Sequence, residues 1–279
     1  MDFQKLFNII ETADPEVFER MDSRRSAMKE FAGMASKVAL ASVPLVFGSM
    51  FKKAYAQSTS TRSAFDVLNF ALTLEHLEAT FYTMGIGSSA VMAGMEYSAL
   101  VDIQKDETAH VNFLTAAITA AGGTPVGAAM QYDFTAGGNF SDVFTNYSTF
   151  LAVAQAFEDT GVRAYKGQAG YLLGTPYLTP ALNIHSVEAR HASFIRQTRR
   201  NYGVAIKPWV TLDGITASGI SAATNASYAG EANTTIAGVQ IVGIAGHTEI
   251  DANTASECFD EILTTDQVLA IAGLFIKQA

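Results

Sequence analysis

Between residues 61 and 203, hydrophobic and polar positions repeat with the period of amphipathic α-helices. The pattern predicts four helices, over about 61–84, 98–121, 142–173 and 181–203. In the first of them the apolar side chains recur at approximately helical spacing, at Phe65, Leu68, Leu72, Ala79 and Tyr82. Helices that each carry one apolar face are expected to bury those faces against one another.

Turn residues separate the four stretches. Gly85 and Gly87 end the first, and the run Gly122–Pro125 ends the second. A glycine-rich connection, residues 126–141, leads to the third stretch, for which Ser141 is the predicted N-cap. Short outer connections and one long central connection predict an all-α four-helix bundle with a crossover between its second and third helices.

The composition changes after Val204, where Thr, Ala, Ser, Gly and Asn dominate. Alternation within residues 234–244 predicts one or two short strands or extended loops. A terminal helix is expected near the end of the chain, capped by Thr265 or Asp266. Its apolar residues should dock on the bundle or on a partner chain: Val268, Leu269, Ile271, Leu274 and Phe275. We therefore expect a bundle over residues 57–203 and an extension with short strands, loops and a terminal helix over 204–279.

The N-terminal segment, residues 1–56, resembles a twin-arginine export signal. Arg24 and Arg25 precede the apolar stretch Val38–Phe51, and Ala54–Ala56 forms a small-x-small pattern typical of signal-peptidase sites. The stretch is shorter than the roughly 20 apolar residues that span a bilayer. The sequence predicts export to the periplasm or cell envelope, with no stable membrane insertion of the mature chain. The alternative is an amphipathic helix with a chance arginine pair.

Composition excludes several classes of protein. The 279 residues are 49% hydrophobic and 16% charged, which is typical of a globular chain and not of a disordered one. The net charge of −9 argues against a nucleic-acid partner. The one cysteine, Cys258, leaves no cysteine-based metal site, and we expect it to be a small buried side chain.

Two Glu-x-x-His steps stand in the second and fourth predicted helices. One joins Glu107 to His110, and the other joins Glu188 to His191. Residues three apart on a helix share one face, so the carboxylate and the imidazole of each step can bind the same metal ion. One such step arises often by chance, whereas two indicate two ions or a pair of ions.

The four helices form two copies of one pattern. The Glu-x-x-His steps are 81 positions apart, and Glu75 and Glu158, on the first and third helices, are 83 apart. A tyrosine follows each of these two glutamates by seven positions, at Tyr82 and Tyr165, which is two helical turns along the same face. Such a repeat is expected of a two-metal site on a pseudo-twofold axis.

Four carboxylates and two imidazoles are the ligand set of paired iron or manganese ions in helical bundles. Fe²⁺ and Mn²⁺ prefer carboxylate oxygen and imidazole nitrogen, and two divalent ions neutralise four carboxylates. We therefore predict two divalent ions, Fe or Mn, as the cofactor. We assign Glu75 and Glu158 as terminal ligands and Glu107 and Glu188 as bridging ligands. His110 and His191 would each bind one ion. The alternative is that all six are surface charges.

Three other residues belong to the predicted site. Tyr82 and Tyr165 are expected to hydrogen-bond a ligand carboxylate, with core packing as the alternative. Glu78, one turn from Glu75, is either an extra or exchanging ligand, a neighbour of the ligands, or a surface residue. The remaining histidines are expected elsewhere: His76 at solvent or an interface, His185 at most as a neighbour of the ligands, and His247 in a structural role.

Several runs resemble the ferritin-like superfamily, and more closely the group that includes plant desiccation-related proteins and exported bacterial relatives. They are LNFALTLEHLEATFY, DETAHVNFLTAAITAAGGTPVG, FLAVAQAFEDTGVRAYKGQ and HSVEARHASFIR. The resemblance covers about residues 61–203 and, more loosely, the tail around Phe259–Ile276. It implies a ferritin-like four-helix bundle that binds metal, and it implies no substrate.

Two functions follow as hypotheses. The first is an exported di-metal protein acting on O₂ or peroxide, as an oxidase, peroxidase or catalase-like enzyme. The second is a non-enzymatic envelope or stress-related protein in which the metal is structural or absent. The sequence leaves open whether the chain forms a homo-oligomer.

Overall fold

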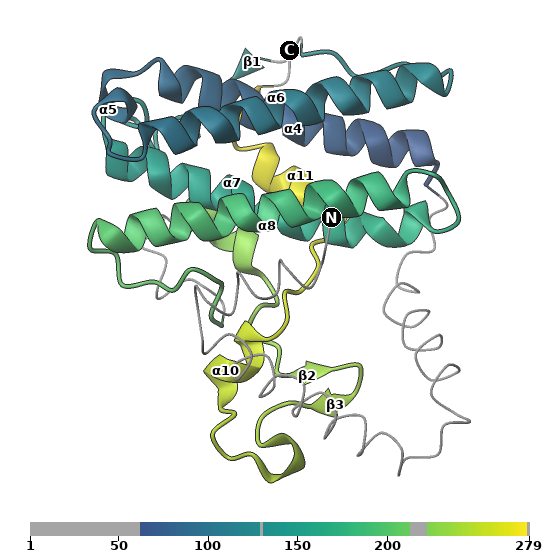
Figure 1. Cartoon of the computed structure of the whole chain (residues 1–279), viewed down its shortest axis with the longest axis vertical. Helices are drawn as coiled ribbons and strands as arrows, with labels where there is room; N and C mark the ends of the chain where they lie inside the picture. The colour runs from purple at the N-terminus through teal and green to yellow at the C-terminus, as the bar shows by residue number, and fades with distance from the viewer. Residues whose placement is uncertain (1–61, 129–130, 213–221, 278–279) are drawn as a thin grey trace, which may run out of the picture. The chain divides into compact units, whose positions relative to one another are not determined.

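Four long helices lie side by side in the computed structural model, as the all-α prediction requires (Figure 1). The structure describes residues 62–128, 131–212 and 222–277, so the predicted export signal lies outside the described residues. The long helices are α4 (Ala64–Ile86), α6 (Tyr97–Ala120), α7 (Tyr147–Gln168) and α8 (Leu178–Asn201). The predicted all-α bundle is confirmed.

Side-chain caps explain where two of these helices begin. Ser63 and Asp66 form a capping box at the start of α4. At α7 the prediction was wrong, because the N-cap is Asn146 and not Ser141. The residues in between form a turn in which the backbone N–H groups of Thr145 and Asn146 both donate to Asp142 O. The helix therefore begins only where the Asn146 side chain accepts from Ser148 N.

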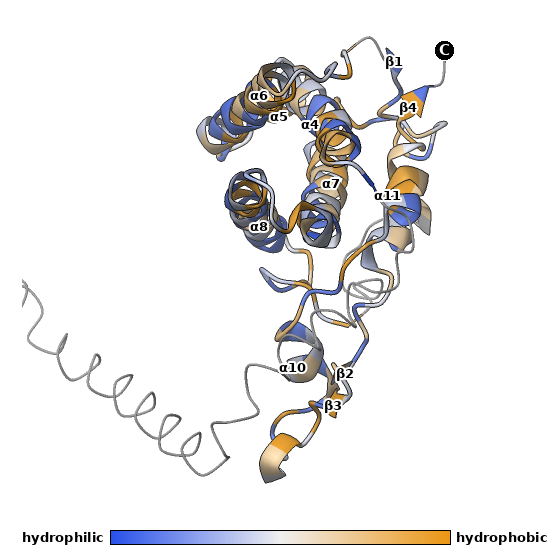
Figure 2. Ribbon diagram, turned by 90° about the vertical axis from the view of Figure 1, so that its right-hand side faces the viewer, coloured by the Kyte–Doolittle hydropathy of each residue, from blue (hydrophilic) through white to orange (hydrophobic). Residues whose placement is uncertain are grey.

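The bundle consists of two helix pairs. α4 packs along α6, α7 packs along α8, and the pairs meet mainly between α4 and α7. Seen end-on, the four helices lie at the corners of a square (Figure 2). Almost every residue of α7 from Phe150 onward is buried, since α4, α8 and the C-terminal extension surround it.

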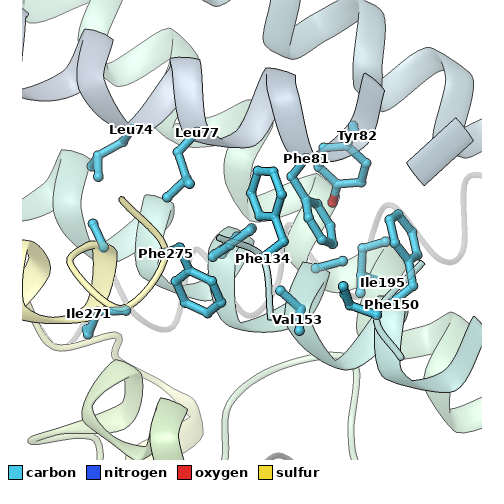
Figure 3. Packing of buried hydrophobic residues seen from close by; sticks show 14 of the residues in the cluster. Leu74, Leu77, Phe81, Tyr82, Phe134, Phe150, Val153, Ile195, Ile271 and Phe275 are labelled. Atoms are coloured by element: carbon cyan, nitrogen blue, oxygen red, sulfur yellow. The ribbon is translucent and has the colours of Figure 1, made fainter. Parts of the chain in front are cut away.

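Aromatic side chains fill the core where α4 and α7 meet. The Phe81 ring stacks on Phe150 with centroids 4.7 Å apart and meets Phe157 edge-on at 5.0 Å. Phe134, from the crossover, and Phe275, from the C-terminal end, complete the same cluster (Figure 3). Segments distant in sequence are thus joined by one continuous core.

The C-terminal end covers the outer side of α7 (Figure 2). Helix α11 (Thr265–Ala272) buries Val268 and Ile271, and β4 (Ile276–Lys277) pairs antiparallel with β1 (Gln131–Tyr132) of the crossover. The N-cap of α11 is Thr264, one residue before the predicted pair, since its capping box uses Gln267. Of the residues expected to dock, Leu269 and Leu274 are exposed instead.

The remaining elements are short. They are α5 (Ser89–Met92), η1 (Ala169–Leu172), η2 (Ala222–Tyr228), η3 (Ile244–Gly246), α10 (Ala252–Glu257) and the antiparallel pair β2 (Thr235–Ile236) and β3 (Val239–Gln240). The strand pair lies within the segment predicted from alternation. Cys258 is exposed, contrary to the prediction, because it occupies the C-cap of α10. Among the described helices, none is long and apolar enough to cross a membrane.

Buried charges tie the extension to α7. Arg163 and Glu231 are both fully buried, with Arg163 Nε 2.9 Å from Glu231 Oε1. The same guanidinium donates to the backbone carbonyls of Ser227, Ala229 and Glu261. One turn away on α7, the Asp159 carboxylate accepts hydrogen bonds from the Arg196 guanidinium and from the Tyr228 hydroxyl. These contacts supply the partners that buried charges require.

Candidate metal centre

Each long helix places one fully buried glutamate at the centre of the bundle. The four are Glu75 on α4, Glu107 on α6, Glu158 on α7 and Glu188 on α8. They lie between two apolar clusters. Ile103 of α6 and Ile195 of α8 belong to the first cluster. Leu114 of α6 and Ile184 of α8 belong to the second. The helices therefore bring the predicted carboxylates together in a site with apolar side chains on both sides.

One histidine lies among three of these carboxylates. His110 Nδ1 is 3.2 Å from Glu75 Oε2, 3.3 Å from Glu107 Oε2 and 3.3 Å from Glu188 Oε1. One ligand atom from each of the four residues lies within 4.8 Å of all the others. We call this set, Glu75, Glu107, His110 and Glu188, the His110 group.

The second histidine has a matching environment. His191 Nδ1 is 2.8 Å from Glu107 Oε1 and 3.5 Å from Glu158 Oε2. Glu107, Glu158, Glu188 and His191 again offer ligand atoms within 4.8 Å of one another, and we call them the His191 group. Glu107 and Glu188 belong to both groups, whereas the other four residues belong to one each. This is the connectivity expected of two terminal and two bridging carboxylates.

Unpartnered polar atoms test whether the site suits a cation. Within the described residues, Glu107 Oε1, Glu158 Oε2, both Glu188 carboxylate oxygens and His191 Nδ1 are buried without a hydrogen bond of good geometry, although His110 and His191 lie within ion-pair distance of these carboxylates. Buried polar atoms of this kind are costly unless something pairs with them. All of them are oxygen or imidazole nitrogen atoms, the donors that Fe²⁺ and Mn²⁺ prefer, so the residues fit a pair of such ions.

The electrostatics agree with that fit. Burial, followed by repulsion from Glu188, raises the pKa of Glu107 well above its usual range, and burial raises the pKa of Glu188 to about 8. Burial opposes a charge on His110, but Glu107, Glu188 and Glu75 outweigh it and raise its pKa to about 12. The carboxylates likewise raise the pKa of His191 to about 9 against burial. Without a cation the cluster retains protons, which bound metal would displace.

Both predicted tyrosines reach a carboxylate, each in the other half of the bundle. Tyr82 on α4 donates to Glu158 Oε1 on α7 at 2.5 Å, and Tyr165 on α7 donates to Glu75 on α4. Sequence spacing places each tyrosine on the face of its own helix's glutamate. The crossed pairing arises because these faces of α4 and α7 oppose each other. Each hydroxyl fixes the orientation of one carboxylate.

Two more acidic residues complete the centre. Glu78 is 4% exposed, which rules out the surface role considered from the sequence. Asp106, which the sequence analysis missed, has Oδ2 3.2 Å from His191 Nε2. Its only sequence signal is its place before Glu107, and its partner lies on another helix. A carboxylate at the second nitrogen of a ligand histidine fixes the ring and its tautomer.

The other histidines lie outside both groups. His76 Nε2 is 3.2 Å from Val126 O in the crossover, and the ring is half-buried. Burial, followed by the charge of Lys166, lowers the pKa of His185. His247 is exposed, with Nδ1 2.8 Å from Glu249 Oε1.

A cleft opens between α6 and α8 above the centre. Its volume is about 440 Å³, and its lining includes Asp102, Asp106, His110, Arg190, His191 and Phe194. Both histidines of the two groups therefore border a space that is open to solvent, while their carboxylates lie beneath them.

Comparison with known proteins places the centre in a family context. A family model described as a ferritin-like domain matches residues 63–201, which include all six predicted ligands. No protein with a curated function matches the chain.

Proposed function

Because the chain belongs to the ferritin-like superfamily through residues 63–201, we propose that it binds two Fe or Mn ions and uses them on O₂ or peroxide. The observation that carries this proposal is the pair of overlapping groups that share Glu107 and Glu188. Two separate cation sites would not need to share residues, whereas a dinuclear centre does.

The residues present divide the work of holding such ions. Glu75 and His110 would bind one ion, Glu158 and His191 the other, and Glu107 and Glu188 both. When bound, Fe or Mn would supply the redox equivalents for reaction with O₂ or peroxide. The hydroxyls of Tyr82 and Tyr165 hold two of the carboxylates in place, which fixes the shape of the centre.

The cleft between α6 and α8 is the proposed path for ions and substrate. It reaches both histidines from solvent, and its lining includes the exposed side chains of Asp102, which pairs with Lys105, and Asp106, which contacts His191. The clusters on either side exclude water from the carboxylates.

Export is part of the proposal. The support is the arginine pair, the apolar stretch and the small-x-small pattern of residues 1–56. Fusion of these residues to a reporter that is active only outside the cytoplasm should give signal. Replacing Arg24 and Arg25 by Lys should abolish the signal, and equal signal from both fusions would contradict export by this route.

Activity of the loaded protein tests the proposed chemistry. The purified chain, supplied with Fe²⁺ or Mn²⁺, should consume O₂ or remove peroxide faster than the same concentration of free ion. The double variant Glu107→Gln/Glu188→Gln, which keeps the side-chain volumes, should lose this excess rate. If the metal-loaded wild-type chain reacts no faster with O₂ or peroxide than the free ion does, the proposed activity is contradicted and the non-enzymatic hypothesis is favoured.

A further inference from the structure

A first difference between the two halves of the centre lies at one pair of matching positions. The 83-residue offset that relates Glu75 to Glu158 also relates Glu78 to Gly161. One half therefore carries a fifth buried carboxyl group, whereas the other half has no side chain at the matching place.

Packing shows why position 161 is a glycine. A Cβ atom there would lie 3.1 Å from Glu188 Oε2 and 3.4 Å from Glu78 Oε1. Both oxygens thus lie against the backbone of α7, one turn from Glu158. Gly161 sits in a regular helix, so it is not needed for an unusual backbone conformation. Its missing side chain is the space that the two carboxylates use.

Glu78 lies on the side of the His191 group. Its Oε1 lies 3.4 Å from the position of a Cβ atom at Gly161, which is one turn along α7 from Glu158, a member of the His191 group only. Within the described part of the chain Glu78 forms no hydrogen bond or ion pair, although it is almost fully buried. A buried carboxyl group without a protein partner is a candidate for pairing with a cation.

A second difference favours the same side. His191 Nε2 contacts Asp106, and the position that the 81-residue offset relates to Asp106 is Val187. A hydrophobic residue therefore stands where His110 would need a carboxylate. A histidine whose second nitrogen meets a carboxylate is held in place and is a more basic ligand.

We propose that Glu78 is a seventh protein ligand, that it belongs to the His191 group, and that this group binds its ion first and more tightly than the His110 group. The inference rests on the proposed dinuclear centre. Its physical basis is that the His191 group has one more carboxylate close by and a better-held histidine.

Titration of the metal-free chain with Co²⁺ tests the order of binding. Calorimetry should resolve two steps about tenfold or more apart in affinity, and visible absorption should change with each step. His191→Ala should remove the tight step, and the matched variant His110→Ala should remove the weak one. In crystals soaked with one equivalent of Co²⁺, anomalous density should lie at His191.

Two variants test Glu78 itself. Glu78→Gln, which keeps the volume, should weaken the tight step by about 10–100-fold and leave the weak step nearly unchanged. Gly161→Ala removes no ligand but crowds Glu78 and Glu188, and it should weaken the same step. Circular dichroism establishes that each variant is folded.

The outcomes separate this inference from the proposed function. Two equal affinities, loss of the tight step in His110→Ala, or unchanged affinities in both Glu78→Gln and Gly161→Ala would overturn the inference while the dinuclear centre stands. A wild-type chain that binds no Co²⁺, Fe²⁺ or Mn²⁺ would overturn both.

Discussion

Glu107 and Glu188 illustrate how single buried residues can favour a bound cation. Both are fully buried, both belong to the two ligand groups, and both have a raised pKa. A buried carboxylate without a partner costs several kcal/mol, so the chain either retains protons there or binds cations. A cation would satisfy both residues at once, because both belong to the two ligand groups.

The crossed tyrosines give a prediction at this scale. Tyr82→Phe removes the hydroxyl that donates to Glu158 and leaves the ring in the core. We expect metal affinity to fall about 10–100-fold because the carboxylate loses the group that orients it. Isothermal titration with Mn²⁺ measures the change.

Tyr165→Phe is the matched variant, since it removes the corresponding bond to Glu75. It should weaken binding to a comparable degree. Wild-type affinity in both variants would mean that the tyrosines serve only as core residues.

The six candidate ligands could be predicted from residue spacing, because the spacing that identifies them lies within each of the four helices or repeats between the two halves of the chain. It could not predict Asp106 or the crossed pairing of the tyrosines, since those contacts join neighbouring helices and depend on how they pack. Cys258 was misplaced for a different reason. Its prediction used the general preference of cysteine for burial, whereas this residue stands at the C-cap of a short helix and is exposed.

At the scale of elements, α7 connects the candidate metal centre to the extension. Glu158 faces the centre, and on other faces of the same helix Asp159 and Arg163 bind residues beyond position 195. Gly167 packs so closely on the extension that a Cβ atom there would clash with the Leu263 carbonyl oxygen. The extension is therefore part of the support of the ligand helices.

Arg163→Ala should destabilise the chain by about 3–5 kcal/mol, because it leaves Glu231 buried without its cation. Urea denaturation measures the free energy of unfolding. Arg200→Ala, at an exposed arginine of α8, is the control and should change it by no more than about 0.5 kcal/mol. An equally small effect of Arg163→Ala would show that the extension does not stabilise the bundle.

The cleft between α6 and α8 gives a kinetic prediction. Ala109 is exposed and lines the cleft, so Ala109→Trp should slow metal uptake at least about tenfold by blocking the path, with no change in the number of ions bound. Stopped-flow absorption with Co²⁺ measures the uptake rate. Ala116→Trp, at an exposed position of α6 outside the cleft lining, should take up metal at the wild-type rate. Equal rates in the two variants would place the path elsewhere.

Periodicity and turn residues were sufficient to predict the four helices and the central crossover. They were not sufficient to predict where α7 starts. Ser141 and Asn146 are both residues that cap helices well, and the turn at Asp142 decides between them. The two-residue pairing of β1 with β4 was also out of reach. It joins segments more than a hundred positions apart, and neither strand has an alternation long enough to detect.

For the whole molecule, the raised pKa values predict how stability changes with pH when metal is absent. Glu188, with a pKa of about 8, keeps its proton in the folded chain, so stability falls as the pH rises from about 4.5 to about 8. His191 contributes stability that is fully present below about pH 6.5 and is lost as the pH rises through about 9. The two effects have the same sign.

The metal-free chain should therefore lose on the order of 6 kcal/mol of unfolding free energy between about pH 5.5 and about pH 8.5, from Glu188 and His191 together. Saturating Mn²⁺ should reverse the trend, because metal binding releases protons and strengthens with pH. Urea denaturation with chelator or with Mn²⁺ at both pH values tests this. A metal-free chain that is more stable at the higher pH would contradict the electrostatic description of the centre.

The central claim, that one chain holds a dinuclear centre, is tested most directly by the metal content of the purified protein. Plasma mass spectrometry should find about two Fe or Mn ions per chain. The double variant Glu107→Ala/Glu188→Ala, which removes both shared ligands, should retain neither ion. A folded wild-type chain that is purified without metal and cannot be loaded with Fe or Mn would contradict the account.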